Sequence, residues 1–198
     1  MAKKETIKLT TPVFRVAFPS VFEKSSYQGS AEKYSLTAIW TPKTFGPRDK
    51  ELWKALLAEM ERASQDAFKK SWKAIPSNNR GIRDGVEKGD MDGFGEGTFF
   101  ATLSTLVEPG VFDRNGNQIV DKDEIYPGVF ARATVNVYAY NNMSKGVAIG
   151  LRNLQKVKDG PRLDGRGDGA KDFADNELDE SWLEEHTDSL LGDTELDF

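Results

Sequence analysis

The side chains best suited to bind a ligand lie on one predicted strand, in the stretch VFARATVNVYAY (129–140). Side chains alternate across a strand, so one side holds only small or apolar residues, which suits a barrel interior. Aromatic rings stack on bases and cations neutralise phosphates. The opposite side of this strand holds both kinds of residue, namely Phe130, Arg132, Thr134, Asn136, Tyr138 and Tyr140. The pattern therefore favours a binding surface for single-stranded nucleic acid.

The alternative interpretation of this aromatic side is that it packs beneath a helix, since a helix must cover some apolar sheet surface. Arg132 weighs against burial, because a buried guanidinium needs a partner. The two interpretations stay open at the level of sequence.

Further candidates come from neighbouring segments. Tyr34 and Trp40 are candidate stacking residues, but they share a strand side with Leu36, so core packing is an equally good interpretation for them. The candidate phosphate contacts are Arg15, Lys33, Lys43, Arg132, Arg152, Lys156 and Lys158.

Other chemistries find little support in the residue types. Cysteine is absent and His186 is the only histidine, so neither a Cys–His nucleophile nor a histidine metal site can be built in the body of the chain. DRNGNQIVDKDE (113–124) partly matches a calcium loop, but Gln118 stands where that loop needs glycine, and a β-hairpin turning at 115–116 is the better interpretation. We expect no catalysis, no cofactor and no metal.

Charge divides the chain unevenly. The net charge is −5, yet residues 172–198 hold eleven of the 32 acidic residues and none of the 27 basic ones. This segment carries −11, and residues 1–171 carry +6. A basic body with an acidic tail suggests an anionic ligand and an internal competitor for it. A tail that only adds solubility is the plainer alternative.

The elements that must position these residues are mostly strands. Strands are predicted over 11–22, 33–41, 98–108, 126–140 and 146–158, and the last two form a hairpin. A helix is predicted over 45–75, with Lys69, Lys70 and Lys73 in its last turn. Residues 76–97 form a long predicted loop. Five strands and one inserted helix predict a mainly β protein built on a small barrel.

The predicted organisation is a binding domain at 1–160, a linker at 161–171 and an acidic flexible C-terminal tail at 172–198. No run of 18 apolar residues exists and no apolar stretch follows the basic start, so we expect neither a membrane span nor a signal peptide. With no cysteine, the cytoplasm is the expected compartment. Trp182 and Phe198 are the predicted docking residues of the tail, because both are apolar side chains among carboxylates.

The chain resembles bacteriophage single-stranded DNA-binding proteins. The resemblance rests on the block YPGVFARATVNVYAYNNMSKGVAIGLRNLQKVKDGPRLDGR, on TPVFRVAFPSVF and KYSLTAIW, and on the acidic end that closes with Phe198. It implies an OB-fold-like five-stranded barrel that binds single-stranded DNA without strong sequence preference in phage replication and recombination. It also implies a tail that competes with DNA and contacts the replicative polymerase and the helicase or primase. The 76–97 loop and Trp182 depart from the family pattern.

Three function classes follow from this sequence, and the least favoured is a calcium-dependent or carboxylate-metal protein. The favoured one is single-stranded DNA binding in the cytoplasm of a bacterial host, with replication proteins as partners and a homodimer as a further candidate assembly. The alternative is a protein-interaction module that recruits a partner through its acidic tail without binding DNA.

Overall fold

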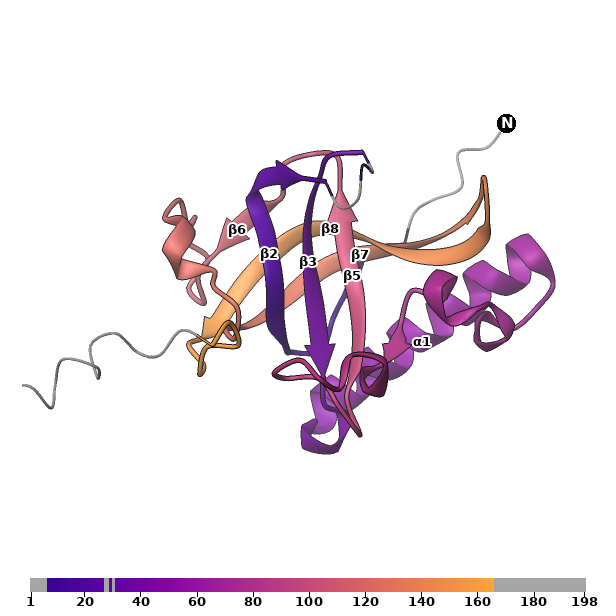
Figure 1. Cartoon of the computed structure of the whole chain (residues 1–198), viewed down its shortest axis with the longest axis horizontal. Helices are drawn as coiled ribbons and strands as arrows, with labels where there is room; N and C mark the ends of the chain where they lie inside the picture. Colours follow the sequence, from indigo (N-terminus) through magenta and orange to yellow (C-terminus); the bar gives the residue numbers. More distant parts are fainter. Residues whose placement is uncertain (1–6, 27–28, 30, 166–198) are drawn as a thin grey trace, which may run out of the picture. The chain divides into compact units, whose positions relative to one another are not determined.

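The computed structural model describes residues 7–26, 29 and 31–165. Its strands are β1 (Leu9–Thr10), β2 (Phe14–Ser25), β3 (Lys33–Trp40), β4 (Arg83–Asp84), β5 (Phe99–Thr105), β6 (Gly110–Phe112), β7 (Phe130–Asn141) and β8 (Lys145–Lys158). The α-helix is α1 (Pro47–Phe68), and the 3-10 turns are η1 (Pro42–Thr44), η2 (Trp72–Ala74), η3 (Ser77–Asn79), η4 (Gly85–Lys88) and η5 (Lys122–Glu124). Figure 1 shows the strands crossing in front of one another around a common interior.

Five of the strands close into a ring. β2 pairs with β3, β3 with β5, β5 with β8, β8 with β7, and β7 again with β2. All of these pairings are antiparallel except β5–β8, which is parallel. A five-stranded, partly open barrel with Greek-key connections is the architecture of the OB-fold. The predicted mainly β fold with one inserted helix is therefore confirmed, with β1, β4 and β6 as short additions.

Alternation along the strands fills the barrel interior. Leu36, Ala38 and Trp40 of β3 are fully buried in the main core, whereas Ile39 on the other side of the strand is buried in a second, smaller cluster. Helix α1 supplies part of the same core through a narrow apolar stripe. Its core residues are Leu56, Met60 and Ala63.

The helix is shorter than the sequence predicts. Pro47 starts it, where a missing N–H costs nothing, and Asp49 in the first turn accepts a hydrogen bond from the Val13 backbone N–H at 3.3 Å. It ends at Phe68, because Lys69 turns into the left-handed region with φ +57°. The predicted extension to residue 75 is wrong, and the three lysines expected in its last turn lie beyond the helix.

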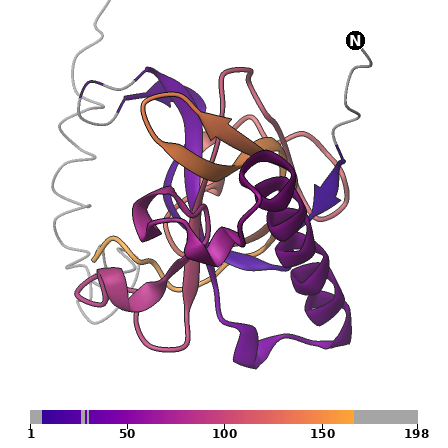
Figure 2. The same ribbon diagram turned by 90° about the vertical axis from the view of Figure 1, so that its right-hand side faces the viewer.

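The β7–β8 hairpin is the longest element of the sheet and confirms the predicted pairing. Its tip extends past the ring of strands and lies beside α1 in both views (Figures 1 and 2). The two strands stay in register over most of their length, with bulges beside Phe130 and Thr134. The hairpin thus presents one side to the core and one side outward.

The start of the predicted linker packs against the barrel. The Arg15 Nη2 donates to the Pro161 carbonyl at 2.5 Å, and the Leu163 backbone N–H donates to the Pro127 carbonyl at 3.0 Å. Gly128 has φ +113°, and a Cβ there would lie 2.1 Å from the Pro161 oxygen. Only glycine permits this approach. Residues 161–164 therefore belong to the folded body.

Candidate nucleic-acid interface

The two sides of β7 separate as the alternation predicts. The inward residues Val129, Ala131, Ala133, Val135 and Val137 are buried, and they share one core cluster with the buried residues of α1. Arg132 and Tyr138 are exposed, so the interpretation that the aromatic side packs beneath the helix is wrong for these residues. We call this outward side the ribbon face, formed by Phe130, Arg132, Thr134, Asn136, Tyr138, Tyr140 and their β8 partners Gly146, Ala148, Gly150, Asn153, Gln155 and Lys158.

Phe130 lies between two cations on the ribbon face. Lys158 is its partner on β8, and the Lys158 Nζ lies 4.8 Å from the ring centroid. Arg15 is its partner on β2, with the guanidinium carbon 5.5 Å from the same centroid. Partial burial lowers the pKa of Arg15, but a guanidinium titrates so far above neutrality that it stays charged. A half-buried ring with a positive charge on each side is suited to hold a base and the phosphates that flank it.

Two arginines follow farther along the hairpin, Arg132 on the ribbon face and Arg152 beside it. Arg132 is exposed, and its Nε donates to the Gln155 Oε1 at 2.8 Å. Arg152 occupies a bulge, because Thr134 pairs with Asn153 and Val135 pairs with Leu151. A bulge leaves the extra residue unpaired and turns its side chain. Both guanidinium groups therefore remain available on the outer surface.

Small residues lie opposite both tyrosines of the ribbon face, but only Tyr138 is exposed. Tyr138 pairs with Ala148 and is 42% exposed. Burial of its other half raises the pKa of Tyr138, and nearby Tyr140 adds to the rise, so its hydroxyl stays neutral at pH 7. Tyr140 is more covered, since it donates to the Asn79 Oδ1 at 3.3 Å and packs on Gly146. Tyr138 is thus the more accessible ring.

A hollow of about 320 Å³ opens on the middle of the ribbon face. Phe112 of β6 forms one wall, and the hydrogen-bonding side chains of Arg132 and Asn153 reach it. Sequence reasoning missed Phe112, because the predicted hairpin turning at 115–116 gave no sign that the strand before the turn pairs with β8. The remaining lining residues are Thr10, Gly116, Ala133, Thr134, Leu154 and Gln155.

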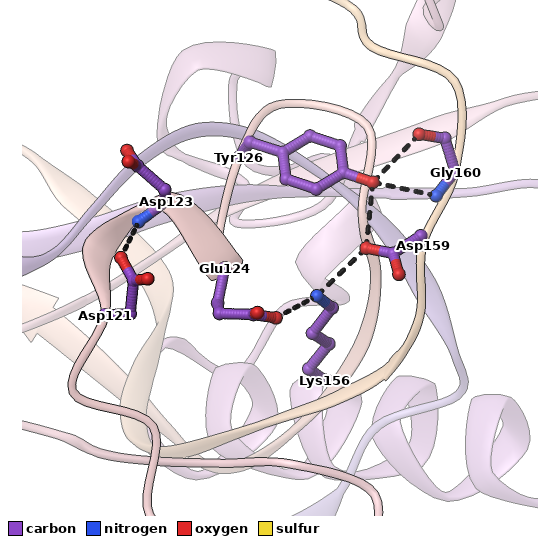
Figure 3. A network of polar contacts seen from close by, with 7 residues as sticks. All are labelled: Asp121, Asp123, Glu124, Tyr126, Lys156, Asp159 and Gly160. Atoms are coloured by element: carbon purple, nitrogen blue, oxygen red, sulfur yellow. Dashed lines mark hydrogen bonds and ion pairs between the residues drawn. The ribbon is translucent and has the colours of Figure 1, made fainter. Parts of the chain in front are cut away.

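Lys156 does not join this surface. Its ammonium forms ion pairs with Glu124 and with Asp159, the latter at 2.9 Å, and its side chain is only 13% exposed (Figure 3). Burial lowers the pKa of Lys156, but its hydrogen bonds to these two carboxylates outweigh burial and raise it overall. The Tyr126 hydroxyl lies 3.0 Å from Asp159 and contacts Gly160 as well. Lys156 therefore stabilises the end of β8, and these ion pairs make it a weaker phosphate candidate than Lys158.

The core interpretation holds for Trp40. It is fully buried and its Nε1 donates to the Pro12 carbonyl at 3.3 Å, so no base can reach the ring. Its candidacy for stacking is wrong, because the inward side of β3 is the barrel interior. Tyr34 is half-buried on that same side near the start of the strand, and the Lys24 ammonium lies 5.6 Å from its ring.

Lys33 and Lys43 lie far from one another. Lys33 begins β3, which is about 23 Å long at 3.3 Å per residue, and Lys43 lies in η1 beyond the other end of that strand. They belong to opposite ends of the barrel, and neither lies on the ribbon face.

A second group of rings and cations lies outside the barrel on β2, β5 and the 85–97 loop. The Lys88 ammonium lies 5.1 Å, 5.4 Å and 5.3 Å from the ring centroids of Phe18, Phe94 and Phe100. We call these four residues the Lys88 cluster. Sequence reasoning missed it, although the Phe18–Pro19 step in β2 and the lone phenylalanine in the loop stretch GFGEG were visible signals.

Several predictions concern regions or groups outside this surface. The 113–117 turn is a hairpin, as predicted. The Asp113 carboxylate holds it by accepting hydrogen bonds from the backbone N–H groups of Asn115 and Asn117.

Within the described residues no group of three or more His, Asp or Glu side chains could hold a metal ion, and no helix there is long and apolar enough to cross a membrane. Trp182 and Phe198 lie outside the described residues.

An OB-like barrel whose outer surface combines rings with cations has the form of a single-stranded DNA-binding protein. The family described as "Enterobacter phage Enc34, ssDNA-binding protein" matches residues 7–183, and the chain belongs to this family. Protein p50 of Acyrthosiphon pisum secondary endosymbiont phage 1 is 33% identical over 159 residues, covering 77% of this chain and 84% of that protein. The resemblance drawn from the sequence is confirmed.

Solved structures show the same fold. The single-stranded DNA-binding protein from bacteriophage Enc34, in complex with single-stranded DNA, matches with a TM-score of 0.67 and 19% identity, over 79% of this chain and 89% of that one. The T7 single-stranded DNA-binding protein gp2.5 matches with a TM-score of 0.54 and 17% identity, over 88% of this chain and 97% of that one.

Proposed function

We propose that this chain binds single-stranded DNA on the ribbon face, without strong sequence preference. The observation that carries the proposal is the position of Phe130 between Lys158 and Arg15 on the outside of a barrel of this family. Phe130 and Tyr138 stack bases, while Arg132, Arg152 and Lys158 contact phosphates. All four nucleobases have a stacking face, so this mode of binding tolerates any sequence.

The expected free energies of stacking and of phosphate contact indicate moderate affinity per nucleotide, which adds up over several nucleotides. Each stacked base contributes about 1–3 kcal/mol. Three phosphate contacts give a log–log salt slope of roughly −2, since single strands contribute about −0.7 per contact. The small residue opposite Tyr138, Ala148, lets a base approach the sheet closely.

The acidic segment 172–198 competes with DNA for this basic surface in the proposed mechanism. Its charge of −11 matches that of a short phosphate backbone. Displaced by a long strand, it becomes available to replication proteins, with Trp182 and Phe198 as the docking residues. A replicative polymerase and a helicase or primase are the proposed partners, in phage replication, recombination and repair within the host cytoplasm.

Fluorescence anisotropy with a labelled oligo-dT tests the proposal. The label belongs on the DNA, because Trp40 and Trp72 are buried and Trp53 packs against the core, so base stacking would not quench them directly. We expect saturable binding that a duplex of equal length competes for poorly and that weakens with salt. Binding of neither DNA form, together with capture of a partner by the tail, would favour the protein-interaction alternative.

A further inference from the structure

Phe18 has an unusual position for a large apolar side chain. It lies in a bulge of β2, because Ala17 pairs with Thr37 while Ser20 pairs with Ser35, so two residues of β2 face one of β3. Its φ is +47°, in the left-handed region that side chains other than glycine rarely adopt. Its side chain remains 55% exposed. Bulges and strained residues of this kind often turn a side chain toward a ligand.

The surroundings of Phe18 are also those of a ligand site. Its ring stacks on Phe94 with centroids 6.4 Å apart, and Phe94 in turn meets Phe100 edge-on at 5.3 Å. The Lys88 ammonium lies within 5.4 Å of all three rings. Among the described residues no carboxylate forms an ion pair with Lys88, although Asp90 is close enough to act on it.

The loop that carries Lys88 and Phe94 is held in place. Arg83 forms an ion pair with Glu87, which also accepts a hydrogen bond from the Ser77 hydroxyl. At the loop base, a Cβ on Gly85 would lie 1.8 Å from the Thr98 hydroxyl oxygen, so only glycine fits there. The cation and the rings are therefore preorganised, and a ligand need not order them on binding.

We infer that Phe18 and Lys88 form a second subsite, which binds one nucleotide of single-stranded DNA apart from the ribbon face. The base stacks on the exposed side of Phe18, and Lys88 contacts the adjacent phosphate. The inference rests on the proposed function and gives the 76–97 loop a role in it. A ring packed only for stability would be covered, whereas Phe18 is 55% exposed.

The position of this subsite fits one continuous path of DNA. Phe18 lies three residues from Arg15 along β2, or about 10 Å. A strand of the 4–16 nucleotides that one OB-fold covers is long enough to reach both residues. The segment after β8 touches both sites, since Pro161 accepts a hydrogen bond from Arg15 and Leu163 packs, like Phe94, against the cluster that contains Phe100. A strand that joins both sites passes beside this segment.

Anisotropy titration of a labelled oligo-dT, with the full chain and its variants over a range of salt, tests the inference. We expect Phe18→Ala to weaken binding about 5- to 150-fold, the range measured for loss of one stacked base. Phe18→Tyr keeps the ring and should bind like the wild type. Lys88→Gln should make the log–log salt slope shallower by about 0.7. Val120→Ala is the control, since Val120 is also apolar and 79% exposed but lies elsewhere.

The outcomes separate this inference from the proposed function. If the wild type binds oligo-dT while Phe18→Ala binds equally well, the second subsite is wrong and the proposed function stands. An unchanged salt slope in Lys88→Gln, a variant that leaves Phe18 in place, overturns the phosphate contact by itself. If the wild type fails to bind at any salt concentration, the proposed function falls and the subsite with it.

Discussion

The Lys158 ammonium lies 4.8 Å from the centroid of the Phe130 ring, directly across the β7–β8 pairing. This relationship places a positive charge beside a ring on the outside of the barrel. Lys156, two residues earlier, points to Glu124 and Asp159 instead. A bulge at Val157 separates the two environments, since Phe130 pairs with Lys158 while Ala131 pairs with Lys156.

Replacing Phe130 with alanine should weaken oligo-dT binding by about 1–3 kcal/mol, because one stacking platform is lost. Phe130→Tyr preserves the ring and should bind nearly as well as the wild type. Anisotropy titration measures both variants, and thermal unfolding shows whether the barrel remains intact. Equal binding by Phe130→Ala and the wild type would remove Phe130 from the interface.

The two neighbouring lysines provide a matched pair of variants. Lys158→Gln should make the salt slope of oligo-dT binding shallower by about 0.7, since it removes one phosphate contact. Lys156→Gln should leave that slope unchanged and should lower the stability of the fold instead, because it removes two ion pairs at the end of β8. The slopes come from titrations at four or more salt concentrations, and stability comes from urea unfolding. The opposite assignment of the two effects would refute the roles given to these residues.

Truncation after Lys171 should tighten oligo-dT binding at low salt, because the −11 competitor is gone. The gain should shrink as salt is raised, since screening weakens the competitor as well. Comparison of the full and truncated chains at 50 mM and 300 mM salt measures this effect. A truncated chain that binds no better at low salt would show that the tail does not compete.

Phe198→Ala should leave oligo-dT binding by the barrel nearly unchanged and should weaken binding to a replicative polymerase or helicase. Surface plasmon resonance with the purified phage replication proteins measures the second effect, and Trp182→Ala tests the other docking residue. Partner binding that is unaffected by both substitutions would contradict the proposed docking.

Gly128→Ala should destabilise the fold through a clash with the segment that follows β8. A Cβ at this position meets the Pro161 oxygen at 2.1 Å and is strained by φ +113°. Gly116→Ala is the control, because Gly116 also has a positive φ but open space around it. We expect Gly128→Ala to cost at least about 1 kcal/mol more than the control in urea unfolding. Equal costs would show that the contact with Pro161 contributes nothing beyond backbone strain.

Alternation along single strands made much of the fold and the ribbon face predictable. The inward and outward sides of β7 follow from the period of two, and the hairpin with β8 follows from the short turn between two strong strands. Trp40 could not be assigned, because an aromatic on an alternating strand suits the core and a binding surface equally well. The ion pairs of Lys156 could not be predicted, since its carboxylate partners become neighbours only after folding.

The Lys88 cluster illustrates what sequence patterns leave out. Phe18 and Phe94 are 76 positions apart, and their stacking depends on a bulge and on a glycine-rich loop with no simple period. The end of α1 was also missed, because Lys69 and the residues after it have good helix propensity. Tertiary packing favours the left-handed turn at Lys69, because the turn lets the next segment pack Trp72 into the core.

The central claim is that single-stranded DNA lies along the outer face of β7 and β8. Photo-cross-linking with an oligo-dT that carries 5-iodouracil, followed by mass spectrometry of the cross-linked peptides, tests it most directly. The account expects the strongest cross-links on the peptide containing Phe130 and Tyr138, with loss of the Phe130 adduct in Phe130→Ala. Cross-links confined to α1 or to the Lys43 region, with none on β7, would contradict it.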